Sequence, residues 1–300
     1  IININRWILA NRINFNRGFR LEFGFYCKNY LKVMTELLID IGVNLSNSRF
    51  NDDLEETLQR AKDANIGQLI LTGTSILETE EVIRICEKFE QQFPKMLYAT
   101  VGIHPHHANE YNSQGLKKLG QLALHKNVVA IGETGLDFNR NFSTEAEQVK
   151  AFEAQLELAS NQHMPLFMHE RDAAKRQLEI LHEYRDHFTQ GVIHCFTGDR
   201  ETLYRYLDLD LYIGVTGWIC DKKRGNQLQS LVSSIPLNRL MIETDAPYLL
   251  PQNIPEKPKN RRNEPAFLPW VLREIANFRE ESLKTIAKET SANAKDFFKI

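Results

Sequence analysis

The chain has 300 residues, of which 42% are hydrophobic, 25% charged and 10% aromatic, a composition typical of a soluble globular protein. This excludes a disordered or fibrous chain, and no window approaches the run of roughly 18 apolar residues that a membrane span requires. The 37 basic and 39 acidic residues nearly balance, so the chain has no broad positive field for nucleic acid. A polyanionic partner must therefore be bound by a few local cations or by a metal ion.

Residues 1–33 differ from the rest of the chain. They contain six basic residues and one acidic residue, whereas residues 34–300 contain 31 basic and 38 acidic residues, a net charge of −7. This bias is found in organelle transit peptides, but the segment has little serine, and a clean strand pattern begins only after Met34. We interpret residues 1–33 as a non-native or disordered extension and residues 34–300 as one domain.

After Met34, short apolar runs alternate with longer amphipathic stretches, the rhythm of repeated βα units. Strands are predicted at residues 37–43, 68–72, 97–102, 128–132, 166–168, 191–194, 211–215 and 239–242. Helices are predicted at residues 52–65, 77–92, 144–161, 171–187, 224–234, 266–278 and 282–298. Eight units in 267 residues match a single α/β (β/α)₈ TIM barrel of about 250 residues. An open, doubly wound sheet is the alternative.

Active sites of TIM barrels lie at the carboxyl ends of the strands. The residues predicted at those ends are Asn44, His104, Glu133, His169, His194 and Asp245. A lone histidine near a strand is more often a hydrogen-bonded core residue, and a lone aspartate is usually a helix cap. Their joint occurrence at the same end of several strands is better explained by a metal site.

Neutral imidazoles and carboxylates together suit a divalent cation, but they do not choose between zinc, manganese and magnesium. Side chains alternate along a strand, so Cys195 points away from the barrel mouth if His194 points into it. This argues against a Cys/His nucleophile. By the same alternation Glu243 faces the same way as Asp245, one layer deeper. It is either a residue that orients a ligand or a buried acid paired for structure.

The segments that carry these residues resemble the TatD family of metal-dependent deoxyribonucleases, which belong to the amidohydrolase-like barrels. The resemblance rests on Asp40-Ile-Gly-Val-Asn44, Gly102-Ile-His104-Pro-His106, Gly132-Glu133-Thr-Gly-Leu-Asp137-Phe, Pro165-Leu-Phe-Met-His169-Glu-Arg171-Asp, His194-Cys-Phe-Thr-Gly198, Glu243-Thr-Asp245-Ala-Pro247 and Arg261-Arg262-Asn263-Glu264-Pro265. These ordered motifs cover the chain from Leu38 to its end.

The resemblance implies a phosphodiesterase that digests single-stranded DNA from its 3′ end, with RNA as a further substrate. Carried over by motif, Glu133, His169 and His194 match the family's metal ligands. Asp245 matches the aspartate that binds metal or activates water, and His104 matches a further catalytic histidine.

One departure from the family pattern concerns the first strand. Most relatives have a His-x-His pair there, whereas this chain has Gly42-Val43-Asn44, as does the branch for which the family is named. Gly42 offers no ligand atom and Asn44 only a neutral carbonyl oxygen, so Asn44 is assigned a supporting role. We therefore expect one tightly held ion, Mg²⁺ before Mn²⁺ or Zn²⁺, and a second ion bound weakly or only with substrate.

Three arginines are candidate phosphate contacts. Arg261 and Arg262 follow the last strand, and their planar guanidinium groups suit bidentate phosphate binding. Arg171 comes two residues after His169. The alternatives are a solvated loop for the first two and an ion pair with a helix carboxylate for Arg171.

Two other classes of function compete with the nuclease. A metal-dependent hydrolase of small amides, esters or aminoacyl adducts could use the same residues, because strand ends of a barrel host many chemistries. A non-catalytic binding protein is the third. The four cysteines are widely scattered, which favours a reducing cytoplasmic setting, and we expect a monomer without a membrane partner.

Overall fold

The computed structural model describes residues 37–300, so the interpretation of residues 1–33 as an extension lies outside the described residues. Each of the eight predicted strands forms, and all but the fourth lie close to their expected bounds. They are β1 (Leu38–Val43), β2 (Ile66–Leu71), β3 (Leu97–Val101), β4 (Val128–Asp137), β5 (Leu166–Arg171), β6 (Gly191–Ile193), β7 (Tyr212–Val215) and β8 (Leu240–Ile242). They pair in sequence order, and every pair is parallel.

The sheet closes on itself between β8 and β1. Val43 forms a parallel bridge with Ala246, and the amide of Asp245 donates to the carbonyl of Gly42 at 2.9 Å. The prediction of a single TIM barrel is therefore confirmed, and an open sheet is excluded.

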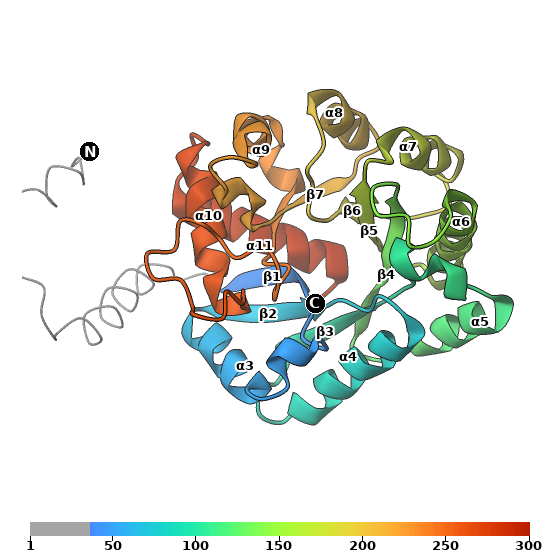
Figure 1. The fold of residues 1–300 in the computed structure, drawn as a ribbon, viewed down its shortest axis with the longest axis horizontal. Coiled ribbons are helices and arrows are strands. Elements are labelled where there is room, and N and C mark those ends of the chain that lie inside the picture. The colour runs from blue at the N-terminus through green and yellow to red at the C-terminus, as the bar shows by residue number, and fades with distance from the viewer. Residues whose placement is uncertain (1–36) are drawn as a thin grey trace, which may run out of the picture. The chain divides into compact units, whose positions relative to one another are not determined.

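Helices surround the strands (Figure 1). They are α3 (Leu54–Asp63), α4 (Ile76–Phe89), α5 (Ser113–Leu122), α6 (Glu145–Gln162), α7 (Ala174–Glu183), α8 (Arg200–Asp208), α9 (Asn226–Leu231), α10 (Leu268–Asn277) and α11 (Leu283–Phe298). Short 3₁₀ helices are η1 (Ser48–Phe50), η2 (Pro105–Glu110), η3 (Gly217–Cys220), η4 (Val232–Ser234), η5 (Leu237–Arg239) and η6 (Pro265–Phe267). Helices α5 and α8 were not among the predicted ranges. Within residues 37–300, no helix is long and apolar enough to cross a membrane.

Helix α11 covers the end of the barrel at which the strands begin. Its Phe297 and Phe298 pack into a buried cluster with strand residues that include Ile39, Phe167 and Met241. The carboxyl ends of the strands are left at the opposite end, as a barrel active site requires.

A buried polar contact reinforces the junction of β1 and β8. Asp40 is completely buried, and its carboxylate accepts hydrogen bonds from the amide of Thr244 at 2.9 Å and from its hydroxyl at 2.5 Å. Burial raises the pKa of Asp40 to about 8, against the opposing effect of these hydrogen bonds. The contact fixes Thr244, and with it the neighbours Glu243 and Asp245.

Strand β4 continues to Asp137, five residues past its predicted end, so Glu133 lies inside the strand instead of at its end. The added residues pair with β5, with Gly135 beside His169 and Asp137 beside Arg171. Gly135 has a positive φ of 125°, and a Cβ there would overlap the carbonyl oxygen of His169. The glycine therefore permits the close strand approach that brings Glu133 and His169 together.

Three buried glutamines of α6 and α7 bind the backbone where β3 and β4 end. Gln155 accepts from the amide of Ile103 at 2.7 Å and donates to its carbonyl at 3.0 Å. Gln148 makes the same pair of contacts with Asp137, and Gln177 accepts from the amide of Leu136. These side chains satisfy buried backbone groups at the end of β4 and in the segment that follows β3.

We expect the substitution Gln155→Leu to lower the free energy of unfolding by about 2–4 kcal/mol, because each unsatisfied buried backbone group costs about 1–3 kcal/mol. Urea unfolding measures this loss. The exposed Gln114→Leu on α5 is the control and should change stability little. An unchanged midpoint for Gln155→Leu would show that these bonds do not hold the β3 end.

Candidate active site

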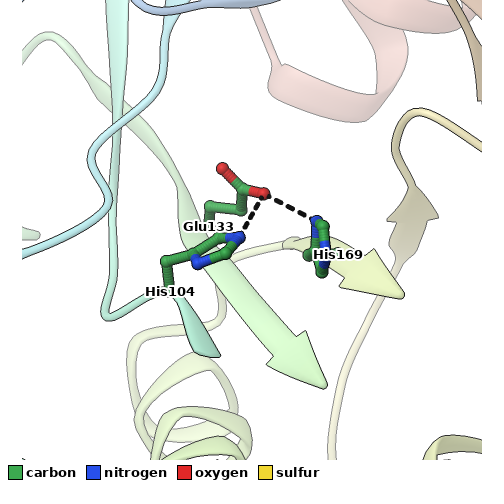
Figure 2. Close-up of side chains that lie close together, drawn as sticks. All are labelled: His104, Glu133 and His169. Atoms are coloured by element: carbon green, nitrogen blue, oxygen red, sulfur yellow. Dashed lines mark ion pairs between the residues drawn. The ribbon is translucent and has the colours of Figure 1, made fainter. Parts of the chain in front are cut away.

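Three imidazoles converge on one carboxylate oxygen at the open end of the barrel. Glu133 Oε1 lies 3.2 Å from His104 Nε2, 3.1 Å from His169 Nδ1 and 2.8 Å from His194 Nε2. Figure 2 shows His104 and His169 approaching this oxygen from two sides. The residues come from four successive strands: His104 follows β3, Glu133 belongs to β4, His169 to β5, and His194 follows β6.

The cluster is a buried network of charges. Glu133 is 6% exposed and His194 is 5% exposed. Burial alone would raise the pKa of Glu133, but His104 and His194 outweigh it and hold that pKa well below its usual range. Burial alone would lower the pKa of His194, but the carboxylates of Glu133 and Glu243 raise it well above 6.5. In the absence of metal, protonated imidazole therefore neutralises Glu133.

His104 differs electrostatically from the other two histidines. Burial lowers its pKa to about 4 despite the attraction of Glu133, so the ring is neutral at pH 7. Its Nδ1 caps η2 by accepting a hydrogen bond from the amide of His106 at 3.0 Å. The single ring proton therefore sits on Nε2 and points to Glu133.

Carboxylates lie behind the other two histidines. Asp137 Oδ2 is 3.3 Å from His169 Nε2 and also 2.8 Å from His106 Nε2. Glu243 Oε2 is 3.4 Å from His194 Nδ1. An orienting role was one of the two interpretations of Glu243 from the sequence, whereas no role was predicted for Asp137. Asp137 lies two residues after Gly135 in the Glu133 motif. Its role behind His169 can be recognised only once β4 is seen to continue as far as Asp137.

Asp245 lies beside the cluster, directly after β8. Burial raises its pKa to about 7, while His194 acts in the opposite direction. Asn44 Nδ2 donates a hydrogen bond to Asp245 Oδ1 at 2.9 Å, which fixes one carboxylate oxygen. The structure thus places the side chains of Asn44 and Asp245 together.

The cluster fits a divalent cation by its donor chemistry. Ligand atoms of His104, Glu133 and His169 all lie within 4.8 Å of one another, and His194 Nε2 reaches the same carboxylate oxygen. Imidazole nitrogen and carboxylate oxygen are the donors of catalytic zinc and manganese sites, and a cation among them would replace the protons that now neutralise Glu133.

The three predicted phosphate contacts have different surroundings. Arg171 donates to Thr197 Oγ1 at 3.1 Å and keeps 41% of its side chain exposed, and Arg261 is exposed on the loop after β8. Arg262 is buried, with its guanidinium 2.6 and 2.7 Å from the two oxygens of Asp53 and stacked over Phe50. The structure does not bring Arg262 to the histidine cluster.

Comparisons with known proteins agree on one family. The family model described as "TatD related DNase" matches residues 39–299. The "3′-5′ ssDNA/RNA exonuclease TatD" of Rahnella sp. is 45% identical over 87% of this chain and 98% of its own length, and that of Citrobacter rodentium is 46% identical over 88% and 98%. The crystal structure of a TatD family hydrolase from Entamoeba histolytica has a TM-score of 0.81 at 27% identity, covering 88% of this chain and 99% of that one.

We expect the stabilisation by a divalent ion to increase with pH. The pKa values of His169 and His194 are raised in the fold, so the stability that their protons contribute is full below about pH 6.5 and is lost as pH rises through the raised values. A metal ion replaces those protons and binds more tightly as they leave. Thermal unfolding with and without excess Zn²⁺, at about pH 6 and about pH 8.5, measures the difference. A metal-induced rise in Tm that is equal at both pH values would contradict this.

Removal of the Arg262 guanidinium should act on stability. We expect Arg262→Gln to lower the free energy of unfolding by about 2–3 kcal/mol, below the roughly 3–5 kcal/mol found when a fully buried ion pair is broken. The reason for the smaller value is that the Asp53 side chain is 31% exposed. Denaturant unfolding provides the measurement, and the neighbouring exposed Arg261→Gln is the matched control, with little change expected. Equal stability of the two variants would refute a structural role for Arg262.

Proposed function

Because the chain belongs to the TatD-related DNase family, we propose that it is a metal-dependent hydrolase of phosphodiester bonds that removes nucleotides from the 3′ end of single-stranded DNA, and of RNA as well. The observation that carries the proposal is the convergence of three imidazoles on the buried Glu133 carboxylate at the open end of the barrel. When these donors hold a metal ion, its positive charge lies at the open end of the barrel, where a phosphate can enter.

Glu133, His169 and His194 would hold the divalent ion. When bound, that ion polarises a phosphodiester oxygen and makes a water molecule more acidic. The residues of the chain supply the remaining chemistry. Asp245 has a pKa near 7 in the fold and accepts the proton of the attacking water, because a base is most effective when its pKa lies near the working pH. Asn44 donates to one of its oxygens, which leaves the other to accept the proton.

His104 serves in this proposal as a neutral hydrogen-bond donor. Its Nδ1 is occupied by the amide of His106, and its Nε2–H points into the cluster. Because burial keeps this ring neutral, with a pKa of about 4, it can donate to a phosphate oxygen without adding a charge that would repel the metal ion.

The partly exposed side chain of Arg171, at the end of β5, and the exposed side chain of Arg261 are assigned to the phosphates of the nucleic-acid strand. Cations at this end of the barrel favour an anionic substrate over a neutral amide. We leave Arg262 out of the substrate site, since its guanidinium is paired with Asp53.

The proposal includes Mg²⁺ as the working ion, with Mn²⁺ and Zn²⁺ as alternatives, and a monomer acting in the cytoplasm. A nitrogen-rich donor set binds Zn²⁺ more tightly than Mg²⁺ in general, so tight binding and the highest turnover need not belong to the same ion. Affinities and rates are therefore measured for all three ions.

The decisive assay uses protein from Met34 onward and single-stranded DNA labelled at its 5′ end. With each divalent ion that supports turnover, we expect a ladder of 5′-labelled products that have been shortened stepwise from the 3′ terminus. After chelation of the metal, we expect no cleavage. Arg171→Gln and Arg261→Gln should each raise KM about tenfold, the loss of one charge-assisted hydrogen bond. Intact DNA under Mg²⁺, Mn²⁺ and Zn²⁺ alike would overturn the proposal.

Two variants of this assay separate metal binding from proton transfer. Glu133→Gln removes a charge at the centre of the cluster and should lose both metal and activity. Asp245→Asn should reduce turnover by at least about 10²-fold, within the range for loss of a general base, while metal affinity remains. Calorimetric metal titration supplies the second readout. Parental turnover in Asp245→Asn would exclude it as the base.

A further inference from the structure

We propose that the groups behind the three histidines divide them into two metal ligands and one hydrogen-bond donor, and that Asp137 and Glu243 are the positioning residues that make this division. A carboxylate behind an imidazole holds a proton on the near nitrogen and leaves a lone pair on the far one, whereas an N–H group behind it does the reverse. The inference deepens the proposed function and rests on it.

The first positioning residue is Asp137, behind His169. Its Oδ1 accepts hydrogen bonds from the backbone amides of Asn139 and Arg140, both at 3.0 Å, which fix the carboxylate in place. Its Oδ2 faces His169 Nε2 at 3.3 Å. The proton of a neutral His169 ring therefore lies on Nε2, and the lone pair of Nδ1 faces Glu133 Oε1, at the metal position.

The second positioning residue is Glu243, which is completely buried behind His194. Its Oε1 accepts from the backbone amide of Cys195 at 2.5 Å. Neither Glu243 Oε2 nor His194 Nδ1 has a hydrogen bond among the described residues, yet the two atoms face each other at 3.4 Å. With Glu243 ionised, a proton on Nδ1 is required to keep two lone pairs from facing each other there, and it leaves the Nε2 lone pair free for metal.

Two glycines make room for the Glu243 carboxylate between β1 and β7. A Cβ at Gly42 would overlap Glu243 Oε2, and a Cβ at Gly214 would lie 2.8 Å from Oε1. The space that a side chain of β1 or β7 would fill is therefore taken by a carboxylate that lies behind His194.

His104 has the opposite arrangement. Its Nδ1 accepts the amide of His106, so its proton lies on Nε2 and faces the cluster. Although His104 is close enough to share a cation with Glu133 and His169, this proton makes its Nε2 a donor and excludes it from coordination. His104 is thereby reserved for an oxygen of the substrate phosphate.

The first experiment reads the ring protons directly in the unaltered protein. Long-range ¹⁵N–¹H correlation spectra of histidine-labelled protein are recorded with and without Zn²⁺. We expect Zn²⁺-loaded His169 to be protonated on Nε2 and His194 on Nδ1, with His104 protonated on Nε2 throughout. Coordination of Zn²⁺ through His104 Nε2, or a proton on Nε2 of loaded His194, would overturn the proposal.

The second experiment inverts the positioning groups. In Glu243→Gln and Asp137→Asn, the oxygen that accepts backbone amides stays in place, so the new NH₂ group must turn toward the histidine. The ring proton then moves to the nitrogen that faces the metal position. We expect each variant to show this tautomer change and to bind Zn²⁺ about 10–100-fold more weakly.

The control is Glu264→Gln, which neutralises another buried carboxylate of the same barrel, one that pairs with Arg60 and bonds no histidine. It should keep both the tautomers and the Zn²⁺ affinity, which separates positioning from general loss of a buried charge. Unchanged tautomers in Glu243→Gln and Asp137→Asn would refute the assignment. Because neither readout uses nucleic acid, a correct tautomer pattern without DNA cleavage would refute the nuclease proposal alone.

Discussion

The buried carboxylate of Glu133 is the constraint on which the rest of the site depends. A carboxylate removed from water must be compensated by nearby positive charge or by hydrogen-bond donors. Three imidazoles within 3.2 Å of its Oε1 provide that compensation. They can do so because β3, β5 and β6, on the two sides of the strand that carries Glu133, deliver their histidines to the same point at the open end of the barrel.

The scaffold holds this point from several directions. Buried glutamines of α6 fix the backbone at the ends of β3 and β4, next to His104 and beyond Glu133. The contact of Asp40 with Thr244 fixes the end of β8, where Glu243 and Asp245 lie. Most of these polar groups bind backbone, so the positions of the catalytic side chains are set by the chain path more than by packing of the side chains themselves.

Sequence reasoning located the strands and the chemistry but not the details of the site. The period of apolar runs predicted eight strands, and the residues at their ends include all four members of the Glu133 cluster. The continuation of β4 was not predictable, because Gly132 and Gly135 are normally strand breakers and act here through contact with β5. The partner of Arg262 was equally hidden, since Asp53 lies 209 residues away in sequence.

The sequence also does not distinguish the roles of the histidines within the cluster. The residue type is histidine whether a carboxylate or a backbone amide lies behind the ring, so no spacing rule separates His104 from His169. The distinction arises from η2, whose first turn is capped by His104, and from strands that place Asp137 and Glu243 behind the other two rings.

The glycine at position 42 limits how this barrel can be altered. A side chain there and the carboxylate of Glu243 compete for the same volume, because a Cβ at Gly42 would overlap Glu243 Oε2. The two positions are therefore coupled: a larger residue at 42 displaces the group behind His194 unless the residue at 243 is shortened as well. Any redesign that adds a ligand side chain to β1 must therefore begin with the residue that follows β8.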